Sequence, residues 1–494
     1  MSEELNLLAF DLGASNGRAI IGKFKNNNIE LQEVHRFSND PVKVHNDLYW
    51  DVLSLLEEIK TGIYKAANQT NNNIDSLGID TWGVDYAILN HKDKLLTNPY
   101  CYRDSRTDGL LDEVINKLSA SKLYNQTGIQ FMKINTLIQL YSDLKYRSEV
   151  LDQAESLLFT PDLFNFFLTG EKYNEYTIAS TSQLFNPTQK NWADELLRNL
   201  ELPVDITEEI IYPGEKIGDL LPYIKKECEI SGELPVMAIG SHDTASAAAA
   251  TPLENTENSI YISSATWSLL GMELNSPLIN NSSREANFTN ECGVGKKIRF
   301  LKNMSGLWLI QECKRIWNKK GKDLTYEQIS QAANQAKEFK FLLNPNDSRF
   351  LSPQDMPKTV REYCKETNQS IPQNYAQLAR GIYESLALSY RAAIENLEEL
   401  TNKKIKNINM VGGGIKAEIL CQFTANATGK KVITGPVEAT AYGNILGQLM
   451  GHGKINNLKE GRNIVRNSVS LTEYSPQNQN EWENAYRKYK KLFL

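Results

Sequence analysis

The chain has 494 residues, more than one hydrophobic core usually serves, so its length favours two large domains. Hydrophobic residues make up 41% and charged residues 23%, a balance that is typical of a globular protein and excludes a disordered or fibrous chain. The net charge of −6 argues against a nucleic-acid partner, because no basic face is available to neutralise phosphates.

Neither secretion nor membrane insertion is indicated. Residues 1–10 carry two glutamates and no basic leader, and the chain has no apolar run of about 18 residues. The six cysteines are scattered without a C-x-x-C pair, which is typical of reduced thiols in a cytosol. We therefore expect a cytoplasmic protein without membrane or nucleic-acid partners. Since the chain has only five histidines, a His-based zinc site is disfavoured, and we expect any metal to be a hard ion held by oxygen. A monomer or homodimer is expected, although the sequence does not determine the oligomeric state.

The first elements in the chain predict a strand, a turn and a returning strand. Residues 7–10 are apolar, residues 11–17 are rich in turn formers, and residues 18–24 are apolar again. Apolar positions recur at helical spacing over residues 52–66, and residues 74–80 and 84–89 predict two more strands. Strands followed by helices indicate a layered α/β domain.

Helical periodicity dominates residues 110–200, where Thr160, Pro161 and Asp162 are typical of a helix start. A buried strand is expected at residues 236–239. It leads through His242 and Asp243 into an alanine-rich helix from Thr244. The first half of the chain is expected to close near residue 250.

The second half repeats this order of elements. Residues 259–263 and 267–272 predict another hairpin, and apolar positions at near four-residue steps predict one long helix over residues 378–400. Residues 408–411 predict a strand that runs into three glycines, with a helix from about residue 416. The order indicates a distant duplication of one domain.

Asp11 ends the first strand, and the turn behind it offers several backbone N–H groups. Glycines let such a turn approach phosphate oxygens closely, so it can bind a nucleotide. A plain β-hairpin with an aspartate at its turn is the alternative.

Gly412, Gly413 and Gly414 lie between a strand and a helix, where adenosine or an α-phosphate can approach bare backbone. A flexible connection is the alternative. Asp243 follows a buried strand and precedes a helix, so its carboxylate is either a site residue or a helix N-cap.

Residues 80–85 combine Trp82 and Gly83 with two carboxylates, the chemistry that binds hydroxyl-rich ligands. Residues 102–106 add arginines and an aspartate, for which a surface loop whose arginines pair with neighbouring acids is the alternative.

Taken together, these segments resemble the FGGY family of carbohydrate kinases, and the resemblance covers nearly the whole chain. It is carried by residues 11–18, 78–85, 102–109, 241–246, 344–350 and 435–439. It implies a two-domain α/β fold of the actin and hexokinase type, also called ribonuclease H-like, with a cleft between the domains. Residues 1–250 would hold the phosphate hairpin, the sugar site and the base, and residues 251–494 would bind ATP.

Matched positions imply a role for individual residues. Asp243 would be the general base, and Asp11 would face Mg²⁺, directly or through water. The residues implied to contact ATP are Ala14, Ser15, Asn16, Gly17, Arg18, Thr266, Asn303, Gln311 and Gly413. The residues implied to contact the sugar are Gly83, His242, Asp243 and Thr244. Ala265 and Cys292 depart from the family pattern, since both stand where the family has glycine, and alanine would strain a loop that needs positive φ.

The implied reaction is ATP-dependent phosphorylation of L-rhamnulose at O1, in the breakdown of L-rhamnose. Asp243 would accept the proton of the hydroxyl that attacks the γ-phosphorus. L-Fuculose, xylulose and glycerol are alternative substrates, because the same scaffold positions any primary hydroxyl. An ATP-binding regulator or chaperone on the same fold is the alternative from another class.

Overall fold

The computed structural model describes residues 4–493; residues 1–3, part of the stretch in which no leader is predicted, and residue 494 lie outside it. The chain divides into two compact units. Unit 1 comprises Met1–Ala250, Glu273–Phe300 and Ala439–Ser468, and unit 2 comprises Thr251–Met272, Leu301–Glu438 and Val469–Leu494. The first segment of unit 1 ends at residue 250, and both units are discontinuous, because later segments pack against earlier ones.

The centre of unit 1 is a six-stranded sheet in the order β13-β14-β6-β1-β2-β3. Its strands are β1 (Leu5–Leu12), β2 (Asn16–Lys25), β3 (Asn28–Ser38), β6 (Ser76–Thr81), β13 (Lys216–Asp219) and β14 (Pro235–Met237). β1 pairs antiparallel with β2 and parallel with β6. Every residue of β1 is buried, as expected for a strand with helices on both faces.

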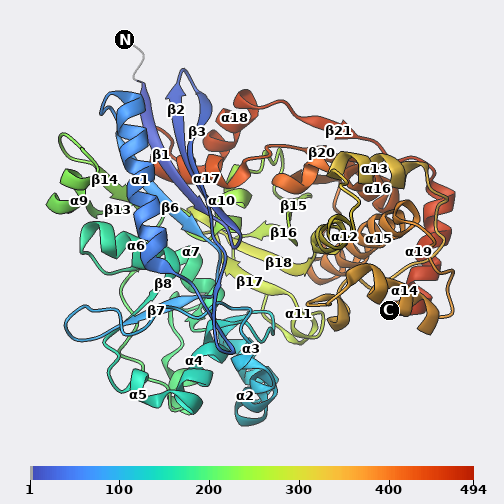
Figure 1. The fold of residues 1–494 in the computed structure, drawn as a ribbon, viewed down its shortest axis with the longest axis horizontal. Helices are drawn as coiled ribbons and strands as arrows, with labels where there is room; N and C mark the ends of the chain where they lie inside the picture. The colour runs from blue at the N-terminus through green and yellow to red at the C-terminus, as the bar shows by residue number, and fades with distance from the viewer. Residues whose placement is uncertain (1–3, 494) are drawn as a thin grey trace. The chain divides into compact units, whose positions relative to one another are not determined.

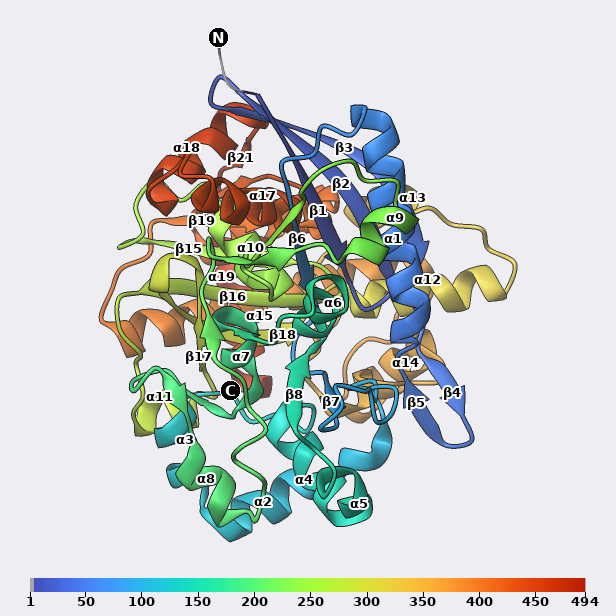
Figure 2. The same ribbon diagram turned by 90° about the vertical axis from the view of Figure 1, so that its left-hand side faces the viewer.

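Helices from distant parts of the sequence cover this sheet. α1 (Val52–Thr70) lies along one face, and α10 (Asp243–Ala250) and α17 (Ala439–Gly451) lie on the other (Figures 1 and 2). α10 and α17 cross so closely that a Cβ atom at Gly443 would lie 1.9 Å from the carbonyl oxygen of Ser246. Only glycine fits at this position, and it allows α17 to pack directly against α10 within unit 1.

Most of the predicted helical region beyond residue 110 forms a second layer of unit 1 at the bottom of Figure 2, whereas residues 160–169 pack against β6 and β13 of the central sheet. Its helices are α2 (Leu110–Leu118), α3 (Ala120–Thr127), α4 (Thr136–Tyr146), α5 (Ser148–Leu151), α6 (Thr160–Thr169), α7 (Tyr176–Ala179) and α8 (Asp194–Asn199). α6 starts at the predicted residues, with Pro161 in its first turn. The region also contains strands, including β8 (Ser156–Phe159), which pairs with β7 (Tyr86–Leu89).

The remaining elements of unit 1 are short. They are β4 (Val42–Val44), β5 (Asp47–Tyr49), β9 (Asn174–Glu175), β10 (Phe185–Asn186), β11 (Asn191–Trp192), β12 (Ile210–Ile211), α9 (Pro222–Glu227), α11 (Asn281–Glu285), β17 (Thr289–Cys292) and α18 (Leu458–Ser468).

A seven-stranded sheet has the order β17-β18-β16-β15-β19-β20-β21. Its further strands are β15 (Ser259–Ser264), β16 (Trp267–Leu274), β18 (Ile298–Ser305), β19 (Asn407–Val411), β20 (Lys431–Thr434) and β21 (Thr472–Tyr474). The helices of unit 2 are α12 (Trp308–Lys319), α13 (Tyr326–Gln335), α14 (Met356–Glu366), α15 (Tyr375–Thr401), α16 (Glu418–Thr428) and α19 (Gln479–Phe493). β15 pairs antiparallel with β16 and parallel with β19, which repeats the pairing of β1 with β2 and β6.

Two further findings concern the whole described chain. No helix within residues 4–493 is both long enough and apolar enough to span a bilayer. All six cysteines are buried and none forms a disulfide.

Candidate functional site

The turn between β1 and β2 is ordered by its own backbone. The N–H of Gly13 donates to the carbonyl oxygen of Asn16 at 2.9 Å, while Ser15 and Asn16 are exposed. Across the hairpin, the Arg18 guanidinium pairs with the Asp11 carboxylate. The turn predicted to bind phosphate is therefore both fixed and accessible.

Asp11 and Asp80 form a pair of carboxylates on neighbouring parallel strands. The Asn444 side chain donates to Asp80 Oδ2 at 2.7 Å, whereas Asp80 Oδ1 is buried without a hydrogen-bond partner among the described residues. Burial, and then the charge of Asp11, raise the pKa of Asp80 well above its usual value. The pair thus leaves one carboxylate oxygen unsatisfied, which is unusual for a buried polar atom.

Asp243 lies at the start of α10, and its side chain is 29% exposed in an otherwise buried loop. The N–H of Thr244 donates to Asp243 Oδ1 at 2.5 Å. An N-cap side chain would accept from an N–H two or three residues further on, so this bond favours a site residue over a cap. Burial raises the pKa of Asp243, and the neighbouring His242 opposes that shift.

The loop that carries Asp243 is held from behind by buried side chains. The N–H of Ser241 donates to Glu175 Oε2 at 3.2 Å, and the N–H of His242 donates to Thr177 Oγ1 at 3.3 Å. A Cβ atom at Gly83 would lie 3.3 Å from His242 Nε2. The residues predicted to contact the sugar, Gly83, His242, Asp243 and Thr244, therefore come together in unit 1.

Asp85 was expected to face a ligand, but protein groups surround its carboxylate. The indole N–H groups of Trp50 and Trp82 donate to Oδ2 at 2.6 and 2.9 Å, and the Gln139 amide donates to Oδ1 at 2.9 Å. Burial raises the pKa of Asp85 to about 6. Asp85 therefore has a structural role in the segment that contains Gly83, and its carboxylate does not face a ligand.

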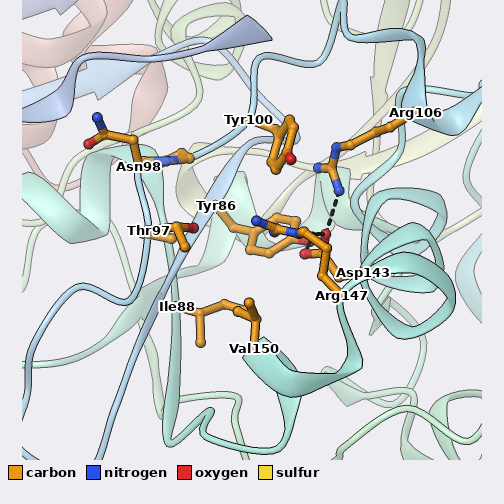
Figure 3. A pocket seen from close by; sticks show the side chains of 11 residues that line it. Tyr86, Ile88, Thr97, Asn98, Tyr100, Arg106, Asp143, Arg147 and Val150 are labelled. Atoms are coloured by element: carbon orange, nitrogen blue, oxygen red, sulfur yellow. Dashed lines mark hydrogen bonds and ion pairs between the residues drawn. The ribbon is translucent and has the colours of Figure 1, made fainter. Parts of the chain in front are cut away.

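Of the two arginines in residues 102–106, Arg106 forms an ion pair with an acid, as the alternative interpretation of this loop predicted. Arg106 donates to the buried Asp143 carboxylate at 2.6 Å, and Arg147 donates to the same oxygen at 2.8 Å (Figure 3). Tyr86 donates to the other oxygen at 2.5 Å. The cavity between these side chains has a volume of about 10 Å³, room for roughly one water and far too little for a sugar.

Unit 2 contains a cavity of about 960 Å³. Three of the residues predicted to contact ATP line it: Thr266, Gln311 and Gly413. Thr266 Oγ1 donates to Gln311 Oε1 at 3.0 Å, which ties the hairpin of β15 and β16 to α12. Asn303 lies on β18 and is not among the residues that line this cavity.

The three glycines of unit 2 have different tasks. Gly412 has φ of 86°, and a Cβ atom at Gly414 would lie 2.2 Å from Ser264 Oγ. Both positions therefore need glycine for the backbone to fit. A Cβ atom at Gly413 would meet nothing within 4 Å, so Gly413 borders open space. The three glycines therefore form a closely packed turn beside the cavity and not a flexible connection.

The departures from the family pattern cause no backbone strain. Neither Ala265 nor Cys292 is among the residues with positive φ. The Cys292 N–H donates to Ser180 Oγ at 2.8 Å, and Ala265 pairs through its N–H with Trp267 at 2.8 Å.

Sequence reasoning missed several residues around Asp243 and Asp80. Asn444 reaches Asp80 from α17, and Arg299 reaches His242 from β18. Neither residue stands in a local pattern that signals a site, and only the long-range packing of unit 1 brings them there. The only local signal for this cluster in the sequence was the pair of carboxylates in residues 80–85.

Residues 6–250 match the FGGY family of carbohydrate kinases, N-terminal domain, and residues 260–452 match its C-terminal domain. Curated relatives named rhamnulokinase align over almost the whole chain. The protein from Bacteroides thetaiotaomicron is 40% identical over 485 residues, which cover 98% of this chain and 99% of the relative. The protein from Bacillus subtilis is 38% identical over 471 residues, 95% of each chain.

Solved structures share the fold at low identity. Gluconate kinase from Lactobacillus acidophilus superposes with a TM-score of 0.83 at 15% identity and covers 99% of this chain and 97% of its own. Xylulose kinase from the same organism gives 0.82 at 16% identity, covering 98% and 97%. The expected two-domain α/β fold is thereby confirmed.

Proposed function

Because this chain belongs to the FGGY family of carbohydrate kinases, we propose that it transfers the γ-phosphoryl group of ATP to O1 of L-rhamnulose. The family makes it a sugar phosphotransferase. Curated relatives that span nearly the full length of both chains carry the name rhamnulokinase, which supports this sugar over L-fuculose, xylulose or glycerol. The observation that carries the proposal is the Asp243 carboxylate, accessible at a helix start beside His242 and Gly83.

Asp243 acts as the general base. Phosphoryl transfer needs little covalent help from the protein, so a positioned carboxylate that accepts the hydroxyl proton is the main group required. The raised pKa of Asp243 makes its carboxylate a stronger base than an ordinary aspartate. The bond from the Thr244 N–H holds one carboxylate oxygen, which leaves the other for the sugar hydroxyl.

The nucleotide binds through two groups of residues. In unit 2, the cavity of about 960 Å³ has the size of a small-molecule site and is lined by Thr266, Gln311 and Gly413. In unit 1, the turn at residues 14–18 offers backbone N–H groups and Arg18 to phosphate oxygens. Asn303 keeps its proposed ATP contact only through the family resemblance.

The residues around Asp11 fit a divalent cation such as Mg²⁺. No three His, Cys, Asp or Glu side chains within residues 4–493 are arranged as a complete metal site. Mg²⁺ usually keeps several waters and takes one or two carboxylates together with substrate phosphates, and the unpartnered Asp80 Oδ1 beside Asp11 suits such a site. When bound, the ion would neutralise charge on the phosphate oxygens, and Asp11 would hold it, directly or through water.

An ADP-release assay over a panel of ketoses and glycerol with Mg·ATP tests the proposal. We expect L-rhamnulose to give the highest kcat/KM, with the phosphate on carbon 1 in the NMR spectrum of the product. A higher value for another sugar would assign that sibling activity instead. ATP binding without phosphoryl transfer to any of these alcohols would favour a regulator or chaperone.

The remaining expectations complete the proposal. We propose a small-molecule ketose as the partner, a cytoplasmic location, and a monomer or homodimer.

A further inference from the structure

Arg299 lies directly behind the proposed sugar site and is almost completely buried. Its side chain is 1% exposed, and its Nε donates to the carbonyl oxygen of Cys292 at 3.1 Å. Its Nη2 donates to Glu291 Oε2 at 2.9 Å and to His242 Nδ1 at 3.1 Å. All these residues belong to unit 1. The guanidinium is therefore held rigidly by several acceptors, one of which is an imidazole.

The bond to His242 determines where the imidazole carries its proton. A guanidinium has donors and no acceptor, so His242 Nδ1 must accept from Arg299. The proton of the neutral ring then resides on Nε2, because the partner of one ring nitrogen sets the state of the other. His242 Nε2 lies 3.0 Å from Thr244 Oγ1, 3.4 Å from Asp243 Oδ1, and next to Gly83. The N–H thus points to the side where the sugar is proposed to bind.

We propose that Arg299, with Glu291, is a positioning residue that fixes His242 as the Nε2–H tautomer and so presents a hydrogen-bond donor to a sugar oxygen beside Asp243. The tautomer follows from the contacts of this chain alone, and only the last step, donation to the sugar, rests on the proposed function. Asp243, Glu291 and Arg299 are the charged groups that face the ring.

Glu291 has two effects that depend on Arg299. It neutralises the buried guanidinium, which otherwise would be an unpaired buried charge. Its Oε2 also lies 3.5 Å from His242 Nδ1, just beyond a hydrogen bond. Thr244 Oγ1 lies nearer, at 3.2 Å from Nδ1, but it carries no charge. Without Arg299, the Glu291 carboxylate beside Nδ1 would favour a proton there, in competition with Asp243 Oδ1 beside Nε2. Removal of Arg299 should therefore let the proton occupy Nδ1 as well as Nε2.

Long-range ¹H–¹⁵N NMR of histidine-labelled protein measures the tautomer without ATP or sugar. The chain has five histidines, and the signal lost in His242→Asn identifies His242. We expect the Nε2–H pattern in the unaltered protein and in Glu291→Gln, where Arg299 still donates to Nδ1. Arg299→Met should show a measurable share of the Nδ1–H pattern. An Nδ1–H pattern in the unaltered protein, or no change in Arg299→Met, would overturn the proposal.

Arg462→Met is the matched control. Arg462 and Glu273 form another buried pair in unit 1, with side chains 6% and 4% exposed and two bonds of 2.9 and 2.6 Å. Its loss should lower the melting temperature about as much as Arg299→Met, yet leave the His242 tautomer unchanged. A tautomer change in Arg462→Met would mean that general loosening of unit 1 moves the proton, and it would overturn the specific role of Arg299.

Kinetics with the best sugar of the panel tests the last step. Arg299→Met should lower kcat/KM for the sugar about 10²-fold, the usual cost of a misplaced site group, while KM for ATP stays unchanged. Arg299→Lys, which can still donate to Nδ1, should recover part of this loss together with the Nε2–H pattern. Equal losses in Arg299→Met and Arg462→Met would reject the role in sugar binding. If no sugar is phosphorylated, the proposed function fails, whereas the NMR result still decides the tautomer.

Discussion

The two sheets have the same pairing of their central strands, but different residues stand at the ends of those strands. In unit 1, Asp11 near the end of β1 lies beside Asp80 near the end of β6. In unit 2, the corresponding strands β15 and β19 end at Ser264 and next to Gly412, whose Cβ position would lie 3.0 Å from the Ser264 carbonyl oxygen. One copy of the arrangement thus carries two carboxylates, and the other carries neutral, small residues.

This difference indicates that the two copies of the repeated fold serve different chemical roles. In unit 1 the raised pKa of Asp243 suits proton transfer, and Asp80 Oδ1, which has no hydrogen-bond partner among the described residues, is available to a cation. Small residues in unit 2 let the backbone border a large cavity, which suits binding of a neutral, flat group.

The largest effect should come from Asp243 in unit 1. Asp243→Asn should lower kcat about 10²- to 10⁴-fold, because the amide cannot accept the hydroxyl proton. ATP affinity, measured by calorimetry, should stay within about twofold, since the cavity of unit 2 is unaffected. Near-normal turnover in this variant would remove Asp243 from the role of base.

The second prediction tests whether Asp11 contributes to Mg²⁺ binding in unit 1. Asp11→Asn should raise the Mg²⁺ concentration for half-maximal activity about tenfold, because a neutral amide is a weaker ligand for a hard ion. Asp152→Asn, at an exposed acid of unit 1, is the control and should leave the titration unchanged. A common Mg²⁺ curve for all three proteins would contradict the assignment.

Neighbouring glycines separate binding from stability in unit 2. Gly413→Val should raise KM for ATP about tenfold with little change in melting temperature, because its side chain would enter open space. Gly414→Val should lower stability by about 1–3 kcal/mol, because its side chain would collide with Ser264. Thermal melts and ATP titrations of both variants check the contrast, and the reverse pattern would disprove it.

The last prediction concerns Asp85, which affects stability and not chemistry. Its pKa of about 6 in the folded protein exceeds the ordinary value of 3.8, so folding favours the protonated carboxyl. Its contribution to stability is fully present below pH 4 and is lost as the pH rises through about 6, by roughly 3 kcal/mol at most. In Asp85→Asn, chemical denaturation at pH 4 and pH 7 should show a smaller difference than in the unaltered protein. An unchanged difference would show that Asp85 ionises normally.

Elements with strong local patterns were predictable from the sequence. The first hairpin, α1 and α15 were each expected within a few residues of their observed ends, because apolar spacing and turn formers act over short stretches. The predicted strand at residues 236–239 is shorter, Pro235–Met237, since the backbone already turns toward Asp243.

Long-range packing was not predictable, and it makes half of the site. Asn444 and Arg299 follow Asp80 and His242 by long stretches of chain, and no spacing rule connects them. Family resemblance supplied Asp243, which stands in residues 241–246, and Gly413, which stands in a run of three glycines. It could not supply Arg299, which stands in an ordinary strand.

The discontinuity of unit 1 also matters while the protein is being made. Its core includes α17, whose Gln448 side chain donates to the Leu8 carbonyl oxygen at 3.0 Å. A ribosome that has released residues 1–250 has therefore delivered a sheet of which one face carries α10 but still lacks α17, and unit 1 is complete only after translation passes residue 468. The nascent chain must stay soluble through that interval, so we expect a fragment of residues 1–250 to aggregate when it is expressed alone.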